Sequence, residues 1–371
     1  MRIDIFKIEE WMNVYSASAK YDLTSTCIKP MSIKELLTLC PAETPFGVLE
    51  EKLTYGDIQG SVRLKKAIKN LYRNHEIENI IVTHGAIGAN ELVFKSVLEK
   101  EDDVIVFVPT YQQHYSLPKS LGANVKFIML HEENGWLPNL REFENAMTRK
   151  TKLVCLANPN NPTGAVLSDE YLKRIVDICK VNNSWLLADE AYRGLNLNGN
   201  RYSESIADLY EKGISTGSMS KAYSLPGLRV GWVVARKDLI SEISKHREYN
   251  TISISMLDDY YSAIALENQE YILERNFEII RAGYNVLKNW LNGEIYIKAN
   301  LPQGGTTAIL RYRKDISSRK LCKDFQRQTG IALLPGFTMD IEGTVRLGYC
   351  QDSEMLKNCL KQFSKYLRTI Q

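Results

Sequence analysis

The 371-residue sequence lacks the features that mark several broad classes of protein. Its seven cysteines form no Cys-x-x-Cys pair, which argues against a disulfide framework and a thiolate zinc site. No apolar run is long enough to span a bilayer, and charges interrupt the N-terminus too early for a signal peptide. The formal net charge is only +3, with no basic stripe that would indicate nucleic acid. We therefore expect a cytoplasmic protein with free thiols, no metal site, and no membrane or nucleic-acid partner.

Two catalytic signatures are also missing or incomplete. A nicotinamide-dependent dehydrogenase would need Gly-x-Gly-x-x-Gly after an early strand, and the sequence has none. Ser218-x-x-Lys221 matches the nucleophile motif of serine β-lactamases, in which Ser218 would be acylated. The partner motifs Ser-Asp-Asn and Lys-Thr-Gly are absent, so the sequence does not favour that chemistry.

Apolar, β-branched runs alternate with amphipathic stretches through most of the chain. This alternation predicts βαβ units around a mainly parallel sheet that is buried on both faces. Strands are expected over residues 80–83, 104–108, 125–129, 152–156, 185–188 and 230–234. Helices are expected over residues 90–98, 167–179 and 239–247.

The pattern changes from about residue 261. One long helix is expected over residues 266–291, followed by strands over 295–298, 308–312 and 345–348 and a helix over 321–328. This is an α+β pattern and indicates a second, smaller domain. We predict an α/β protein with a large domain over residues 45–280 and a small domain built from 1–44 and 281–371.

Candidate functional residues follow the expected strands, where parallel sheets bind their ligands. Small residues over 84–90 would let helix N-terminal amides approach an anion, and Tyr111 could stack on a flat ligand. Two prolines hold the amide of Asn161 in a rigid Asn-Pro-Asn-Asn-Pro-Thr-Gly loop. Asp189 ends a buried strand, where a carboxylate needs a cationic partner, and Tyr192 lies in the same segment.

The most specific stretch runs from residue 218 to 232 and reads Ser-Met-Ser-Lys-Ala-Tyr-Ser-Leu-Pro-Gly-Leu-Arg-Val-Gly-Trp. Lys221 could form an imine with an aldehyde cofactor if its pKa is lowered from the solution value. Ser218 and Arg229 could converge with it on a phosphate dianion or its surroundings.

Taken together, these motifs resemble the class I/II aminotransferases, the aspartate-aminotransferase branch of the fold-type I pyridoxal-phosphate enzymes. The matches are Asn-Pro-Asn-Asn-Pro-Thr-Gly, Asp-Glu-Ala-Tyr, and Ser-x-x-Lys followed by Gly-Leu-Arg-Val-Gly-Trp, in the family's order. The resemblance implies a fold-type I structure with pyridoxal 5'-phosphate as cofactor. It implies transfer of the amino group of an L-α-amino acid to a 2-oxo acid.

The resemblance also implies roles for individual residues. Lys221 would be the Schiff-base lysine and the proton carrier, Asp189 would hold the pyridine nitrogen protonated, and Tyr192 would contact the cofactor's 3' oxygen. Arg346 would grip the substrate α-carboxylate with help from Asn161. The remaining cofactor contacts would come from Ala86, Ile87, Tyr111, Asn161, Ser218 and Arg229, and from Tyr55 of a neighbouring subunit in a homodimer.

Several positions depart from the family pattern. Ala86 and Ile87 stand where many relatives carry hydroxyl residues, and the segment over 22–28 lacks the usual glycine-rich turn. No second arginine is evident for a dicarboxylate substrate, so we expect neutral or aromatic side chains. Three further segments, Ile-Glu-Glu-Trp near the N-terminus, Thr-Ser-Thr and Gly-Gly-Thr-Thr-Ala, bear a looser resemblance to capreomycidine synthase. Elimination or cyclisation of an amino acid therefore stays open. A non-catalytic protein that binds pyridoxal phosphate or an amino acid is a more distant alternative.

Overall fold

A computed structural model describes residues 2–39 and 52–370 of the chain. Its centre is a seven-stranded sheet in the order β2-β8-β7-β6-β5-β3-β4. Every neighbouring pair is parallel except those made by β8, which is antiparallel to β2 and β7. The expected mainly parallel sheet is therefore confirmed. Its strands are β2 (Ile80–His84), β3 (Asp103–Val108), β4 (Asn124–Met129), β5 (Thr151–Ala157), β6 (Trp185–Asp189), β7 (Gly213–Ser218) and β8 (Val230–Val234).

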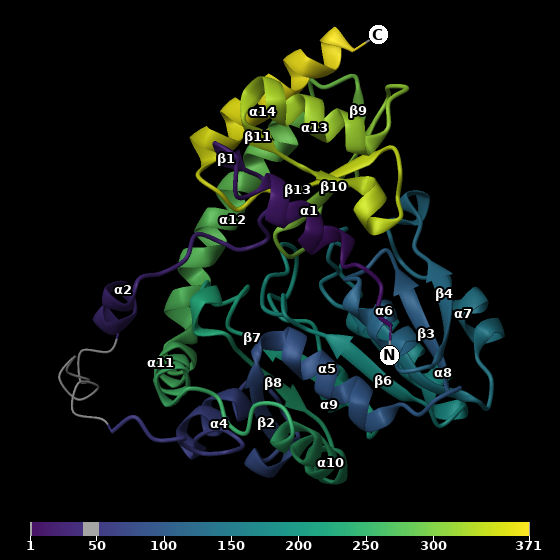
Figure 1. Ribbon diagram of the computed structural model, residues 1–371, viewed down its shortest axis with the longest axis vertical. Helices are drawn as coiled ribbons and strands as arrows, with labels where there is room; N and C mark the ends of the chain where they lie inside the picture. Colours follow the sequence, from purple (N-terminus) through teal and green to yellow (C-terminus); the bar gives the residue numbers. More distant parts are fainter. Residues whose placement is uncertain (1, 40–51, 371) are drawn as a thin grey trace.

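Helices cover both faces of this sheet (Figure 1). Alternate residues of β3 show the two-sided burial, since Val104 and Val106 face one apolar cluster while Ile105 and Phe107 face another. The first cluster is closed by α5 (Gly85–Val97), α6 (Gln113–Ser120) and α10 (Lys237–Glu248). The second is closed by α4 (Val62–Lys69), α7 (Leu140–Ala146), α8 (Asp169–Val181) and α9 (Ile206–Leu209).

Strand β7 was not expected from its sequence, Gly-Ile-Ser-Thr-Gly-Ser. Its residues are nevertheless all buried, and it lies between β6 and β8. The glycines suit this crowded position, because a Cβ atom at Gly217 would lie 2.3 Å from the Trp232 ring. The position of β7 between two paired strands therefore explains why it is a strand, although its own sequence has few apolar residues.

The second part of the chain is an antiparallel sheet in the order β12-β13-β10-β9, which packs against one helix that in turn contacts a second. Its elements are β9 (Ile297–Lys298), β10 (Thr307–Tyr312), β12 (Leu334–Pro335), β13 (Thr344–Gly348), α13 (Ser318–Thr329) and α14 (Ser353–Thr369). The N-terminal segment joins this part, where β1 (Tyr21–Asp22) pairs with β11 (Ile331–Ala332). The expected α+β pattern of this region is present.

The prediction of one long helix over residues 266–291 is wrong in one respect. Two helices occupy the region, α11 (Met256–Glu267) and α12 (Gln269–Leu291), and Asn268 separates them. The side-chain amide of Asn268 donates a hydrogen bond of 2.9 Å from its Nδ2 atom to the Ile264 carbonyl, and this local contact competes with continuation of the helix. The domain boundary placed at residues 280–281 lies inside α12, and the one placed at 44–45 lies outside the described residues.

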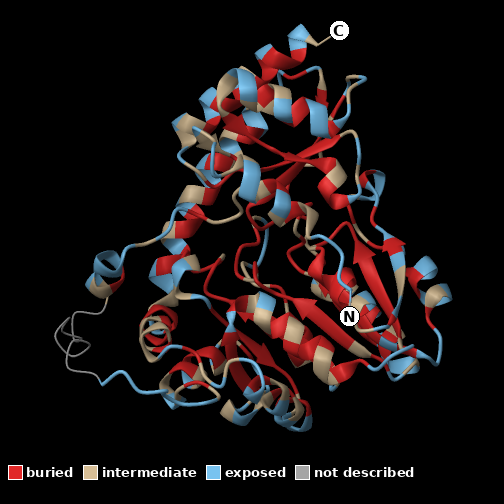
Figure 2. Ribbon diagram, in the orientation of Figure 1, coloured by how far each residue is buried: buried red, intermediate tan, exposed pale blue. Residues whose placement is uncertain are grey.

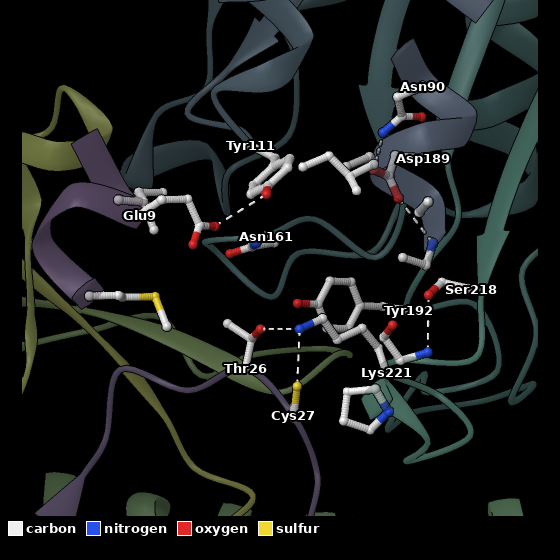
Figure 3. A pocket seen from close by; sticks show the side chains of 18 of the residues that line it. Glu9, Thr26, Cys27, Asn90, Tyr111, Asn161, Asp189, Tyr192, Ser218 and Lys221 are labelled. Atoms are coloured by element: carbon white, nitrogen blue, oxygen red, sulfur yellow. Dashed lines mark hydrogen bonds between the residues drawn. The ribbon is translucent and has the colours of Figure 1, made fainter. Parts of the chain in front are cut away.

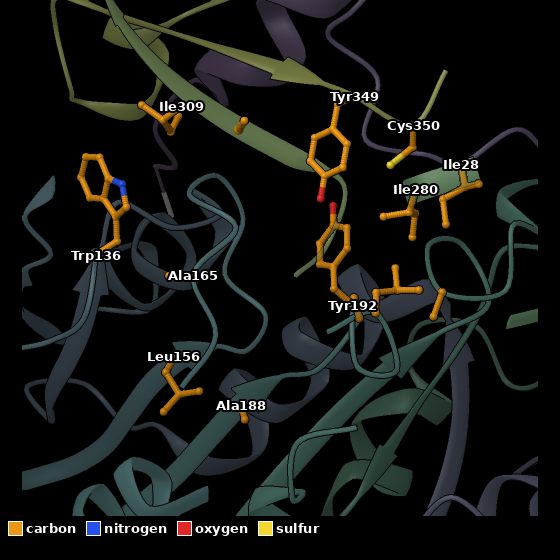
Figure 4. Close-up of a cluster of buried hydrophobic side chains, with 14 of the residues drawn as sticks. Ile28, Trp136, Leu156, Ala165, Ala188, Tyr192, Ile280, Ile309, Tyr349 and Cys350 are labelled. Atoms are coloured by element: carbon orange, nitrogen blue, oxygen red, sulfur yellow. The ribbon is translucent and has the colours of Figure 1, made fainter. Parts of the chain in front are cut away.

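One apolar cluster reaches across both parts of the molecule. Figure 4 shows Leu156 and Ala188 from the central sheet and Ile309 and Tyr349 from the small sheet among its members. The sheet strands are buried almost throughout, while exposed residues lie on the outer faces of the helices (Figure 2). Within the described ranges, no helix is both long and apolar enough to cross a membrane. All six cysteines described there are free, and Cys40 lies outside them.

Candidate active site

A cavity of about 400 Å³ opens at the carboxyl ends of the central strands. Its walls come from the segments that follow β2, β3, β5, β6 and β7, and from Arg346 in β13. The N-terminal segment completes it with Ile8, Glu9 and Met12 of α1 (Lys7–Tyr15) and with Thr26 and Cys27 (Figure 3). The cavity therefore lies where the central sheet, the small sheet and the N-terminal segment meet.

Lys221 reaches into this cavity from the loop after β7. Its Nζ donates to Thr26 Oγ1 at 2.6 Å and to Cys27 Sγ at 3.3 Å. Burial lowers the pKa of Lys221, but Tyr192 and Cys27 raise it, and the net pKa lies above its ordinary value. The lowered pKa that imine formation requires is thus not produced by these protein neighbours alone.

Asp189 lies at the end of β6 and is buried at one wall of the cavity. Its carboxylate accepts from Asn90 Nδ2 at 2.9 Å and from the Ala191 amide at 3.1 Å, and it lies 3.3 Å from His114 Nε2. Burial raises the pKa of Asp189, but His114, Asn90 and the amide outweigh it and hold the pKa below its ordinary value. Asp189 is therefore a carboxylate suited to a cationic ring nitrogen.

The N-terminus of α5 forms an anion-binding corner. The helix begins at Gly85, immediately after β2, so the separate loop expected over residues 84–90 is instead the first turn of the helix. Gly231 is required here, because a Cβ atom on it would lie 2.6 Å from the Ala86 nitrogen. Ser218 and Arg229 lie close to this first turn. Ser218 pairs with Gly231 in the sheet, and the Arg229 Nη2 atom is only 3.0 Å from the position that a Cβ atom on Gly85 would occupy. Helix amides, a hydroxyl and a guanidinium thus converge, which suits a phosphate.

Arg346 and Asn161 form a second polar corner. Arg346 is 1% exposed, and its Nη1 donates to Asn161 Oδ1 at 3.1 Å while its Nη2 donates to the Thr24 carbonyl at 2.8 Å. Burial lowers the pKa of Arg346 from its ordinary value. A guanidinium held this rigidly is well placed to bind a carboxylate.

Two buried polar groups at the cavity have no hydrogen-bond partner within residues 2–39 and 52–370. They are the Tyr192 hydroxyl and Arg346 Nε. Because buried polar groups are nearly always satisfied, both point to a polar ligand that supplies acceptor atoms. In the same ranges, no cluster of His, Cys, Asp or Glu side chains is arranged to hold a metal ion.

Nearly all the residues proposed from the sequence line the cavity. Ala86, Ile87, Tyr111, Asn161, Asp189, Tyr192, Ser218, Lys221, Arg229 and Arg346 do so. Tyr55 does not. It is 74% exposed on the outside of the single chain, and among the described residues its one hydrogen bond is accepted by its carbonyl from Ser253 Oγ at 2.6 Å. Its role in a neighbouring subunit stays a prediction.

The fold places at the site several side chains to which the sequence alone assigns no role. Asn90 and His114 hold Asp189, while Thr26 and Cys27 hold Lys221. Glu9 reaches the cavity from α1 and accepts from the Tyr111 hydroxyl at 3.3 Å. No aminotransferase motif marks them, although Asn90 lies in the segment that contributes Ala86 and Ile87. Glu9 and Thr26 lie in the Ile-Glu-Glu-Trp and Thr-Ser-Thr segments that resemble capreomycidine synthase.

Comparisons with known proteins find similar sequences and similar structures over most of the chain. The family model described as aminotransferase class I and II matches residues 33–363. The chain is 29% identical over 364 residues to capreomycidine synthase of Streptomyces vinaceus, covering 98% of this chain and 93% of that one. It is 28% identical over 320 residues to aspartate aminotransferase of Pyrococcus horikoshii, covering 83% and 81%. A crystal structure of a PLP-dependent aminotransferase from Streptococcus suis shares 37% identity at a TM-score of 0.96, covering 100% and 99%.

Proposed function

Since the chain belongs to the aminotransferase class I and II family, which works with pyridoxal phosphate, we propose that it transfers the amino group of an L-α-amino acid to a 2-oxo acid. The observation that carries the proposal is one cavity lined by Lys221, Asp189, Arg346 and the N-terminus of α5. Each of these four groups has the chemistry needed to bind one part of the cofactor or of the amino acid. When bound, the cofactor supplies an electrophilic aldehyde and an aromatic electron sink.

The anion corner and Asp189 would hold the cofactor. The first-turn amides of Ala86 and Ile87 would bind the phosphate, with Ser218 and Arg229 beside them. Asp189 would keep a proton on the ring nitrogen, because its lowered pKa makes it a carboxylate at neutral pH. The free hydroxyl of Tyr192 would donate to the 3' oxygen, and Asn161 would contact the same oxygen. Tyr111 would pack against the ring.

Arg346 and Lys221 would act on the substrate. Arg346 would bind the α-carboxylate, with Asn161 holding both the guanidinium and the carboxylate. Lys221 would remove the proton from the substrate Cα and return it to the cofactor carbon, as a general base and then a general acid.

We further propose a homodimer in which Tyr55 completes the partner's phosphate site. The six free thiols fit a reducing compartment, and we keep the cytoplasm as the expected location.

Elimination or cyclisation of an amino acid is the second candidate. It is favoured by 29% identity to capreomycidine synthase over nearly the full length of both chains. Lys221, Asp189 and Arg346 would have the same tasks in that reaction, so these residues do not separate the two. Their shared position in one cavity argues against the more distant alternative, a non-catalytic binding protein.

Borohydride reduction of the purified protein tests the shared part of the proposal. We expect reduction to fix a pyridoxyl group on Lys221, as found by peptide mapping. A screen of amino acids then tests the reaction. Release of a 2-oxo acid with the nitrogen retained on the cofactor means transamination, while loss of ammonia or ring closure means the second candidate. A pyridoxyl group on another lysine would refute the assignment of Lys221.

Thr26 gives a prediction about how Lys221 is positioned. Thr26→Val removes the hydroxyl that accepts from Lys221 Nζ at 2.6 Å while keeping the volume of the side chain. We expect kcat to fall about tenfold with KM changed less than about twofold, because the lysine is misplaced while the carboxylate site is untouched. Steady-state kinetics on the best amino acid measure both constants. Thr26→Ser should restore kcat, and equal loss in both variants would assign Thr26 a packing role only.

A further inference from the structure

The wall of the cavity that faces the N-terminus carries an acidic residue that the proposed reaction leaves unused. Glu9 projects from α1 toward Tyr111 and Asn161 (Figure 3). Its Oε1 accepts from the Tyr111 hydroxyl at 3.3 Å. Within the described ranges, Glu9 forms no ion pair. Its carboxylate therefore has no salt-bridge partner in those ranges, in a cavity that is to receive an amino acid.

Helix α1 holds Glu9 in this place from both sides. At its start, the Lys7 amide donates to Gln112 Oε1 at 2.9 Å, and Gln112 Nε2 donates to the Ile5 carbonyl at 2.7 Å. Farther along the helix, Trp11 Nε1 donates to the Leu333 carbonyl at 3.1 Å. Lys7, the nearest lysine along the chain, pairs instead with Asp340. The carboxylate is thus fixed at the cavity and is not neutralised by its own helix.

The other charges that line the cavity have assigned partners under the proposed function. Lys221 and Arg229 serve the cofactor, Arg346 serves the α-carboxylate, and Asp189 serves the ring nitrogen. Burial lowers the pKa of Arg346, and Glu9 is one of the acidic neighbours that oppose this shift. Once a substrate carboxylate occupies Arg346, that guanidinium no longer compensates Glu9. A second positive charge would then be favoured next to Glu9.

The surfaces on either side of Glu9 are apolar. Ile8 and Met12, one residue before it and three after it, line the same cavity. An apolar wall that ends in a carboxylate matches a side chain with a long aliphatic stem and a charged head. Lysine and arginine have this shape, whereas aspartate and glutamate would bring a second carboxylate toward Glu9.

We propose that Glu9 selects L-amino acids whose side chains end in a cation, an ammonium or guanidinium group. This inference rests on the proposed function and replaces the expectation of neutral or aromatic side chains. Glu9 is a specificity residue in this scheme, since it touches the distal end of the substrate and takes no part in proton transfer. The negative charge selects for a cation and against a dicarboxylate.

Matched amino acids test the proposal on the wild-type holoenzyme. L-citrulline replaces the guanidinium of L-arginine with a neutral group of similar shape, and L-norleucine keeps the four-carbon stem of L-lysine but lacks its ammonium group. Titration followed by the cofactor's absorbance gives the apparent Kd, and the rate of its change gives the half-reaction. We expect at least one cationic amino acid to bind about tenfold or more tightly than its neutral match, and L-glutamate to bind most weakly.

Glu9→Gln then removes the charge and keeps a hydrogen-bonding group next to Tyr111. We expect the preference for the cation to fall below about twofold, with the affinity for the neutral match nearly unchanged. Glu10→Gln is the matched control, because Glu10 is the next residue of α1 and is exposed. This control should keep the full preference.

Several outcomes would overturn the inference. The wild type could show no preference for either cation, the preference could survive in Glu9→Gln, or the variant could weaken all amino acids equally. In those cases a pyridoxyl group on Lys221 and conversion of neutral amino acids would leave the proposed function standing. If no amino acid of any charge binds, the proposed function fails together with the inference. The wild-type comparison decides the matter even if the variant does not fold.

Discussion

Lys221→Ala is expected to lower the turnover of the best amino acid by roughly 10⁴-fold while the protein still binds pyridoxal phosphate. The amine is the proposed proton carrier, and no other lysine within residues 2–39 and 52–370 lines the cavity. Binding should persist because Asp189 and the N-terminus of α5 do not depend on the lysine. Single-turnover kinetics on the reconstituted variant measure the loss directly, since they separate chemistry from cofactor exchange.

Two controls make the Lys221 result interpretable. Lys221→Arg keeps a positive charge but offers no amine of suitable pKa, so it should be as inactive as the alanine variant. Borohydride should fix no pyridoxyl group on either variant. Activity within about tenfold of wild type in Lys221→Ala would show that another group moves the proton, and the assignment would be abandoned.

Arg346→Ala is expected to weaken amino-acid binding by about 100-fold, with the cofactor still attached to Lys221. The guanidinium is almost fully buried and is held by Asn161 and the Thr24 carbonyl, so no other described group can take its place without rearrangement. Losing one partner of a buried charge pair costs about 2–5 kcal/mol, which sets the size of this effect. Titration with an amino acid, followed by the cofactor's absorbance, gives the change in Kd.

Arg346→Lys distinguishes charge from geometry. Lysine keeps the positive charge but lacks the planar fork that binds a carboxylate through two parallel hydrogen bonds, so it should recover only part of the affinity. A simple amine that lacks the α-carboxylate should bind wild type and both variants equally. Unchanged amino-acid affinity in Arg346→Ala would remove this residue from the substrate site.

Much of the site could be predicted because its motifs are local. Lys221, Ser218 and Arg229 lie within one short stretch, and Asp189 and Tyr192 lie within another. The strand that precedes Asp189 and Tyr192 is a continuous apolar run, so its end could be placed to within a residue. The strand that precedes Lys221 was not predicted, and there the motif alone marked the site. Parallel strands bring those ends to one edge of a sheet, which is why separate motifs could be expected in one cavity.

Other residues escaped prediction because long-range packing defines their roles. Asn90 and His114 lie 99 and 75 residues from Asp189 along the chain, and Thr26 lies 195 residues from Lys221. Strand β7 has a weak apolar pattern, and it is a strand because β6 and β8 pair with it on either side. The break at Asn268 depends on a side chain bonding to its own helix, which periodicity does not register.

The sequence by itself determined the family and its cofactor, and it predicted the lysine that would carry that cofactor and the carboxylate that would hold its ring nitrogen. It could do so because each of these depends on a short motif at the end of a strand. Only the tertiary structure decided which further side chains line the cavity. The packing of α1 between Gln112 and Leu333 brings Glu9 to the cavity, and that position follows from contacts across more than 100 residues.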